Sequence, residues 1–248
     1  MDEFNFFYFI ILLIVIIQSI VGVGVLVIGT PFFLFLNFEM ITIISILLPI
    51  SLFTSFINRI IIENNKKYEK IKIDKSTKKN FFLLCLPAIF IGLIFLNFFK
   101  EKINFKILVA VIIFFSVICK ILYKRLFFLH NHYTSKIVMF VSGIIHGLSN
   151  SGGTLLLIFI NLVNRGMIRK NRLSMNFFYF YLVLFQYLIF LAVFNKTLKF
   201  EFDIFLLILI LLGVILGNFL EKYIKISIFE NLVNLMALTA AVSLILSA

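Results

Sequence analysis

The segment GIIHGLSNSGGT, residues 143–154, interrupts an apolar run that extends from Ile137 to Val163. The run is too long for one straight membrane helix, which needs about 20 residues. Glycine at membrane depth weakens the backbone hydrogen-bond ladder, and the freed polar groups are tolerated only inside protein or beside a watery cavity. The segment therefore predicts a helix that is broken at a functionally important position.

A similar break lies near the start of the chain, where Gly22, Gly24, Gly29 and Pro31 interrupt the apolar run Phe6–Leu36. Residues 29–37 align without gaps to residues 153–161, with Gly, Thr, Phe and Asn identical at matching places and an offset of 124 residues (154 − 30) in a chain of 248. A chance match in so apolar a sequence is the alternative. The symmetric placement favours a duplication, with repeats of about 6–126 and 136–247 inside one membrane domain, 1–248.

The composition places the chain in a membrane. Hydrophobic residues make up 62% and charged residues 14%, whereas soluble domains carry about 45–50% and about 25%. The net charge of +12 comes from basic residues between the apolar runs, as the positive-inside rule predicts. Because no basic stretch is large enough to fold, nucleic acid is not expected as a partner. We expect the polar stretch from Arg59 to Asn80 to touch anionic lipid headgroups.

We predict an all-α, polytopic membrane protein with two homologous halves, each made of one broken segment and three further helices. The eight apolar segments are Phe6–Leu36, Met40–Phe56, Phe81–Phe99, Ile103–Leu122, Ile137–Val163, Phe177–Phe194, Ile204–Leu220 and Ile226–Leu246. If all eight segments cross the membrane, the cytoplasmic side holds 14 basic residues and the outside holds 9, with the group Arg165–Arg172 outside. If the two broken segments are re-entrant, so that each enters and leaves on the same side, the cytoplasmic side holds 18 basic residues and the outside holds 5. The second topology obeys the positive-inside rule better and makes the halves inverted repeats.

The two breaks predict an anion site built from backbone groups. We expect one helix to start at Thr30-Pro31 and another near Ser151, each with a Ser or Thr hydroxyl as its cap. Each start would expose unpaired N–H groups and about half a positive charge. The candidate substrate-binding residues are Gly22, Gly24, Gly29, Thr30, Pro31, His146, Ser149, Asn150, Ser151, Gly152, Gly153 and Thr154. His146 could bind the anion, carry a proton or only join two helices. The alternative for the glycines is close helix packing, which we favour for Gly213 and Gly217.

The residues missing from the apolar segments also restrict the function. No Asp or Glu lies in the middle of a segment, and the sequence has no catalytic carboxylate pair, metal-ligand cluster or nucleotide-binding loop. We therefore expect no enzyme activity, no metal and no cofactor. Transport of a small anion is the leading hypothesis. A non-transporting accessory or scaffold subunit is the main alternative, and a lipid-modifying membrane enzyme is a weaker one.

The glycine-rich breaks at residues 22–31 and 143–153, the four-plus-four layout, the basic loop after the second segment and the pair Gly213 and Gly217 resemble the sulfite exporter TauE/SafE family. The resemblance covers essentially the whole chain. It implies a multi-pass protein of the bacterial inner membrane that moves small anions, such as sulfite, sulfonates or related organosulfur and carboxylate compounds. Direction, coupling ion and any homo-oligomer are left open.

Overall fold

The computed structural model describes residues 3–66, 68–69, 71–126, 132–164, 167–194, 203–223 and 226–248, and no strand occurs among them. The all-α prediction is confirmed. A π-helical turn, Phe81–Cys85, joins α4 to α5. The helices are α1 (Glu3–Val21), α2 (Val25–Phe35), α3 (Met40–Glu63), α4 (Lys75–Asn80), α5 (Leu86–Phe99), α6 (Phe105–Leu126), α7 (His132–Ser149), α8 (Gly152–Val163), α9 (Ile168–Phe194), α10 (Ile204–Leu220) and α11 (Ile226–Leu246).

Among the described residues, three helices are long and apolar enough to cross a membrane: α3, the continuous helix Lys75–Phe99, and α9. Four of the shorter apolar helices, α1, α2, α7 and α8, are the pieces into which the two breaks divide the long apolar runs. Large apolar side chains are exposed on many of the helices, among them Phe98, Ile204 and Leu246. Contiguous apolar surface of this kind is stable only against lipid or another protein, which agrees with a membrane protein.

The first break lies earlier than the sequence predicted. α2 begins at Val25, so Thr30 and Pro31 lie inside the helix instead of at its start. The cap comes from a side chain of the preceding helix, because the Gln18 amide oxygen accepts a hydrogen bond from the Val25 N–H at 3.0 Å. Gly22 turns the chain with φ +90°, a conformation that side chains other than glycine rarely adopt.

The second break lies where it was predicted, since α8 begins at Gly152. The expected hydroxyl cap is absent: the Ser151 hydroxyl donates to the Ser149 carbonyl at 3.1 Å instead. Asn150 has φ 61° and donates its N–H to the His146 carbonyl at 2.9 Å.

The local geometry of the two breaks repeats at an offset of 128 residues (150 − 22), because Gly22 also has a positive φ and donates to the carbonyl four residues earlier, at 2.7 Å. The sequence alignment used an offset of 124. The difference of four residues is about one helical turn, so the two offsets place residues on nearly the same helix face.

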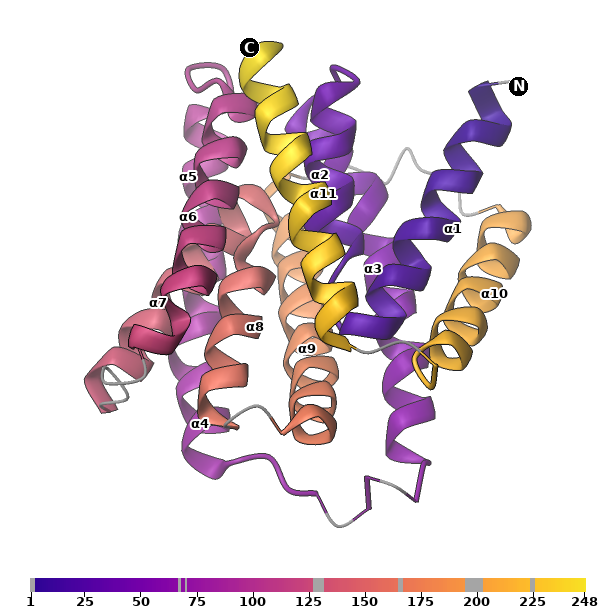
Figure 1. The fold of residues 1–248 in the computed structure, drawn as a ribbon. Helices are drawn as coiled ribbons and strands as arrows, with labels where there is room; N and C mark the ends of the chain where they lie inside the picture. Colours follow the sequence, from indigo (N-terminus) through magenta and orange to yellow (C-terminus); the bar gives the residue numbers. More distant parts are fainter. Residues whose placement is uncertain are drawn as a thin grey trace.

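The two helix pairs that flank the breaks point in opposite directions (Figure 1). In that view α1 descends from the N-terminus and α2 returns upward, whereas α7 ascends and α8 returns downward. The upper end of the bundle is tied together by Lys106, whose ammonium group donates to the Asn37 side chain at 2.8 Å and to the Ser247 carbonyl at 2.9 Å. The ends of α3, α8 and α10 lie at the lower end, as do the starts of α4, α7, α9 and α11.

Glycine permits two close helix crossings, α1 with α10 and α5 with α7. A Cβ atom placed on Gly147 would overlap the Ile89 carbonyl oxygen, and one on Gly143 would overlap the Cys85 carbonyl oxygen. In the other crossing, a Cβ atom on Gly213 would meet Val15, and one on Gly217 would meet Ser19 and the Ile16 carbonyl. The packing role that the sequence predicted for Gly213 and Gly217 is confirmed, and Gly143 and Gly147 have the same role.

A buried hydrogen-bond network closes the lower end of the bundle around Arg172 in α9. The sequence grouped Arg172 with loop charges, but the structure places it in a helix at 6% exposure. Its guanidinium group joins α1, α9, α10 and the segment after α3. The partners are the Tyr68 hydroxyl at 3.1 Å, the Ser19 carbonyl at 3.3 Å, the Asn218 side chain at 2.7 Å and the Glu221 carboxylate at 2.9 Å.

We predict that Gly147→Ala destabilises the protein more than Gly213→Ala. The new methyl group at residue 147 meets a backbone oxygen, whereas at residue 213 it meets the Val15 side chain at 2.7 Å and no backbone atom. The cost should be about 2–3 kcal/mol for Gly147→Ala and about 1 kcal/mol for Gly213→Ala. Thermal unfolding in detergent measures both, and equal melting temperatures would contradict this account of the crossings.

We also predict that Arg172→Met costs about 3–5 kcal/mol, because it leaves Glu221 and Asn218 without their buried partner. The double variant Arg172→Met/Glu221→Gln should lose less than the sum of the two single variants, since the charge that was left alone is then removed as well. Chemical unfolding of all three variants in detergent checks this. Full additivity would show that the pair does not act as a unit.

Candidate functional site

The two breaks touch each other in the middle of the bundle. The Asn150 side-chain amide donates to the Thr30 hydroxyl at 3.1 Å. A Cβ atom placed on Gly153 would lie 3.3 Å from a methyl carbon of Val23. Thr30, Asn150 and Ser151 are all buried. The structure therefore brings residues of the two halves together that are far apart in the sequence.

The starts of the two short helices, α2 and α8, differ in whether a side chain accepts a hydrogen bond from their free backbone N–H groups. At α2 the Gln18 side chain accepts from Val25 and also donates to the Ser51 carbonyl at 3.1 Å and to the Ser55 hydroxyl at 2.9 Å. No side chain caps α8. The first turn of a helix carries unpaired N–H groups and a partial positive charge, so the start of α8 is the better place for an anion.

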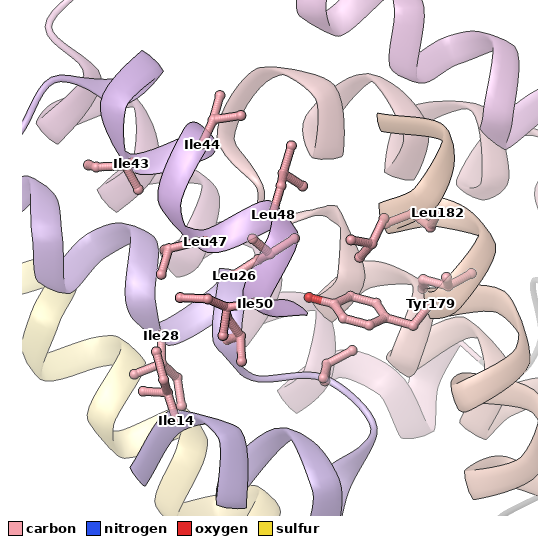
Figure 2. Close-up of a cluster of buried hydrophobic side chains, with 14 of the residues drawn as sticks. Ile14, Leu26, Ile28, Ile43, Ile44, Leu47, Leu48, Ile50, Tyr179 and Leu182 are labelled. Carbon is pink, nitrogen blue, oxygen red and sulfur yellow. The ribbon is translucent and has the colours of Figure 1, made fainter. Parts of the chain in front are cut away.

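Tyr179 in α9 lies between these two helix starts. A Cβ atom on Gly153 would meet its ring at 2.7 Å. Its hydroxyl faces Ser51 and the backbone of Leu26, without forming a hydrogen bond of normal geometry. Figure 2 shows the hydroxyl pointing across the buried cluster toward Leu26 and Ile50. The sequence analysis missed Tyr179, because nothing distinguishes one tyrosine among the many aromatic residues of its segment.

His146 lies against Tyr179, with the two ring centroids 6.1 Å apart. It is fully buried, and neither ring nitrogen has a hydrogen-bond partner among the described residues. The Ser142 hydroxyl one turn earlier, the Tyr179 hydroxyl and the Gln186 side-chain oxygen are also buried without a partner in the described part of the chain. Buried polar atoms are costly unless they are hydrogen-bonded, so this group indicates a place for a small polar ligand or water.

Gln186 in α9 is a second residue that the sequence analysis missed. Its amide nitrogen donates to the His146 carbonyl at 3.1 Å and to the Asn150 side-chain oxygen at 2.8 Å. Because a backbone carbonyl can only accept, the orientation of this amide is fixed. Gln186 therefore holds the end of α7 and the turn of the second break against α9.

A Cβ atom on Gly152 would overlap the Ser142 carbonyl oxygen and lie 2.6 Å from the His146 Cβ atom. The bare glycine backbone is what lets the start of α8 approach α7 this closely. Gly152, Gly153 and His146 thus lie in the same small region as Tyr179.

Several other predicted residues have contacts that are structural. Gly29 lies against Leu47 and Ile14, and Gly24 lies against the backbone of Gln18. Pro31 lies in the middle of α2, and Gly22 contacts Met175 and Asn176 from α9. The hydroxyl groups of Ser149 and Thr154 donate to the carbonyl oxygens of Ile145 and Ser151, at 2.8 and 2.7 Å. These residues shape the breaks without presenting a polar group that is left unpaired.

Two cavities lie at the ends of the bundle, each of about 500 Å³. One is bordered by Arg59, Lys72 and Phe177, and the other by Asn37, Lys100 and Lys106. Neither includes a residue of the two breaks. The described residues contain no group of three His, Cys, Asp or Glu side chains that could hold a metal ion.

A family model, "Sulfite exporter TauE/SafE", matches residues 7–244. No curated protein and no solved structure matches the chain. The matched range covers nearly all of the 248 residues and includes both breaks, both glycine crossings and Tyr179. The protein therefore belongs to the sulfite exporter TauE/SafE family, a family of membrane transporters.

Proposed function

We propose that this protein is a secondary transporter that moves a small oxyanion across the bacterial inner membrane, and that the anion binds at the start of α8 beside Tyr179. One observation carries the proposal most directly. The uncapped start of α8 lies against Ser142, His146 and Tyr179, and each of these residues has a buried polar group with no partner in the described structure.

These groups suit a small anion. The first-turn N–H groups of α8 and the two hydroxyl groups can all donate hydrogen bonds, and neutral His146 can donate one more. Such donors stabilise negative charge in an apolar surrounding without a buried Lys or Arg. Sulfite, sulfonates and small carboxylates are the substrate classes that we infer from family membership.

The repeated contacts support inverted halves. When residues are shifted by 128, two glycine contacts in one crossing become glycine contacts in the other. Val15 and Gly213 correspond to Gly143 and Cys85, and Ser19 and Gly217 correspond to Gly147 and Ile89. Such an exchange of partners is what a two-fold axis relating repeats of about 6–126 and 136–247 would produce.

The opposite directions of the α1–α2 and α7–α8 pairs in Figure 1 support an axis in the membrane plane, with three full crossings per half. The connections at the lower end are those to which the sequence assigns 18 basic residues, so we place that end in the cytoplasm. In this arrangement the two halves would rock about the breaks and open the site to each side in turn.

The two breaks are buried, so the centre of the bundle is closed. This observation also favours the second candidate function, that of a non-transporting scaffold subunit. A scaffold subunit would keep this centre packed permanently and would co-purify with a partner protein. A transporter needs it to open and would show substrate flux as the isolated protein. We assign no catalytic residue, since transport by a member of this family requires no enzyme chemistry.

The test is a flux screen of the purified protein in proteoliposomes with sulfite, sulfate, sulfonates and small carboxylates. Tyr179→Phe should lower the flux of the transported anion by about tenfold to a hundredfold, because one hydrogen bond to a charged group contributes about 1.5–3 kcal/mol. The melting temperature should stay the same or rise, since the hydroxyl group is buried without a partner in the closed state.

Tyr187→Phe is the matched control, because Tyr187 lies on the same helix, is half-buried and has no place at the breaks. Wild-type flux in the Tyr179→Phe protein would remove Tyr179 from the site. No flux of any tested anion, together with a stable partner protein, would favour the scaffold function.

A further inference from the structure

The cavity at the lower end of the bundle has a strongly uneven charge. It has a volume of about 500 Å³ and lies between the end of α3, the residues before α4, α4 itself and α9. Four cationic side chains border it, those of Arg59, Lys72, Lys75 and Lys78, and one carboxylate, that of Glu63. The basic segment that the sequence assigned to headgroup contact thus forms one wall of a defined cavity.

The carboxylates near the cavity are already engaged. Glu63 accepts from the Arg59 side chain at 2.8 Å. Asp74 accepts from the Thr77 N–H at 2.7 Å and from the Thr77 hydroxyl at 2.9 Å, and these bonds to the start of α4 hold the pKa of its carboxyl group below the usual value. Within the described part of the chain, no ion pair engages the three lysines of the cavity. They are therefore available to a ligand of negative charge.

The cavity continues into an apolar, aromatic surface. The Lys78 ammonium group lies 4.5 Å from the centre of the Phe177 ring. The Arg59 guanidinium group lies 5.1–5.4 Å from the ring centres of Phe177, Phe180 and Tyr181. Two outer phenylalanines pack against these rings, Phe82 at 40% and Phe56 at 48% exposure. Cations thus border a group of aromatic rings, two of which are exposed.

We propose that this cavity binds the phosphate group of an anionic phospholipid, with the acyl chains lying over Phe56 and Phe82. A free phosphate ion would use the lysines but would leave the adjoining aromatic surface uncovered, whereas a phospholipid uses both. The proposal does not depend on the anion site at α8, because the two sites share no residue. Basic pockets between helices at the cytoplasmic side are suited to phosphate headgroups.

The experiment measures retained lipid by native mass spectrometry of the full-length protein in detergent, after titration with phosphatidylglycerol or with phosphatidylcholine. The test variant is Lys72→Gln/Lys75→Gln/Lys78→Gln. The matched control, Lys66→Gln/Arg169→Gln/Lys222→Gln, removes the same charge from exposed positions at the same end of the bundle but outside the cavity. Melting temperatures check that both variants are folded.

We expect phosphatidylglycerol to bind wild type at least about tenfold more tightly than phosphatidylcholine, and the test variant to lose most of this preference while the control keeps it. Inorganic phosphate at millimolar concentration should not displace the lipid. An equal loss in both variants would mean general attraction to the basic end and would overturn the proposal. Displacement by inorganic phosphate would show a site for the free ion. If the test variant is unstable, the wild-type comparison of the two lipids decides, and equal binding refutes the proposal.

Discussion

A helix that stops inside the membrane leaves backbone N–H and C=O groups unpaired, and these groups must find hydrogen-bond partners inside the protein. The rest of this structure depends on which partners they find. The start of α2 is satisfied by Gln18, which in turn is held by Ser51 and Ser55. The turn before α8 is held by Asn150, which bonds to Thr30 of the other half. Because polar groups in an apolar surrounding have few alternative partners, these bonds fix where the two halves meet.

The close crossings position these breaks. Glycine lets α7 approach α5 and lets α10 approach α1, so that the backbones themselves are in contact. Helices in lipid gain little from burying apolar side chains and depend on such close packing. With α1 and α7 held in this way, the breaks at their ends meet beside Tyr179. The helix crossings and the site are therefore parts of one arrangement, and the Arg172 network closes it at the lower end.

Much of this arrangement could be predicted from the sequence, because glycine, proline and charge leave strong local signals in an apolar chain. The second break, the helical class and the packing role of Gly213 and Gly217 were all visible in this way. The start of α2 was misplaced, because its cap comes from Gln18, a side chain seven residues earlier. The sequence suggested Thr30 as the cap because helix starts favour hydroxyl side chains. It could not reveal the hydrogen bond from Val25 to Gln18, which forms only because the chain turns at Gly22.

Tyr179, Gln186 and Arg172 were missed for a different reason. Their roles come from contacts across the fold, with Gly153, with Asn150 and with Glu221. One aromatic or amide residue among many in an apolar segment carries no local sign of such a contact. Arg172 lies near the start of its helix, where a basic residue is ordinarily exposed, and only the packing of α1, α9 and α10 shows that it is buried.

The central claim is that an oxyanion binds where α8 begins, and the location of the bound anion tests it most directly. Selenite, a heavier analogue of sulfite, scatters anomalously, so crystals soaked with it reveal where it binds. The account predicts an anomalous peak next to the backbone of Gly152 and Gly153, within hydrogen-bond distance of the Tyr179 hydroxyl. A peak confined to the basic residues at the ends of the bundle, with an empty centre, would contradict it.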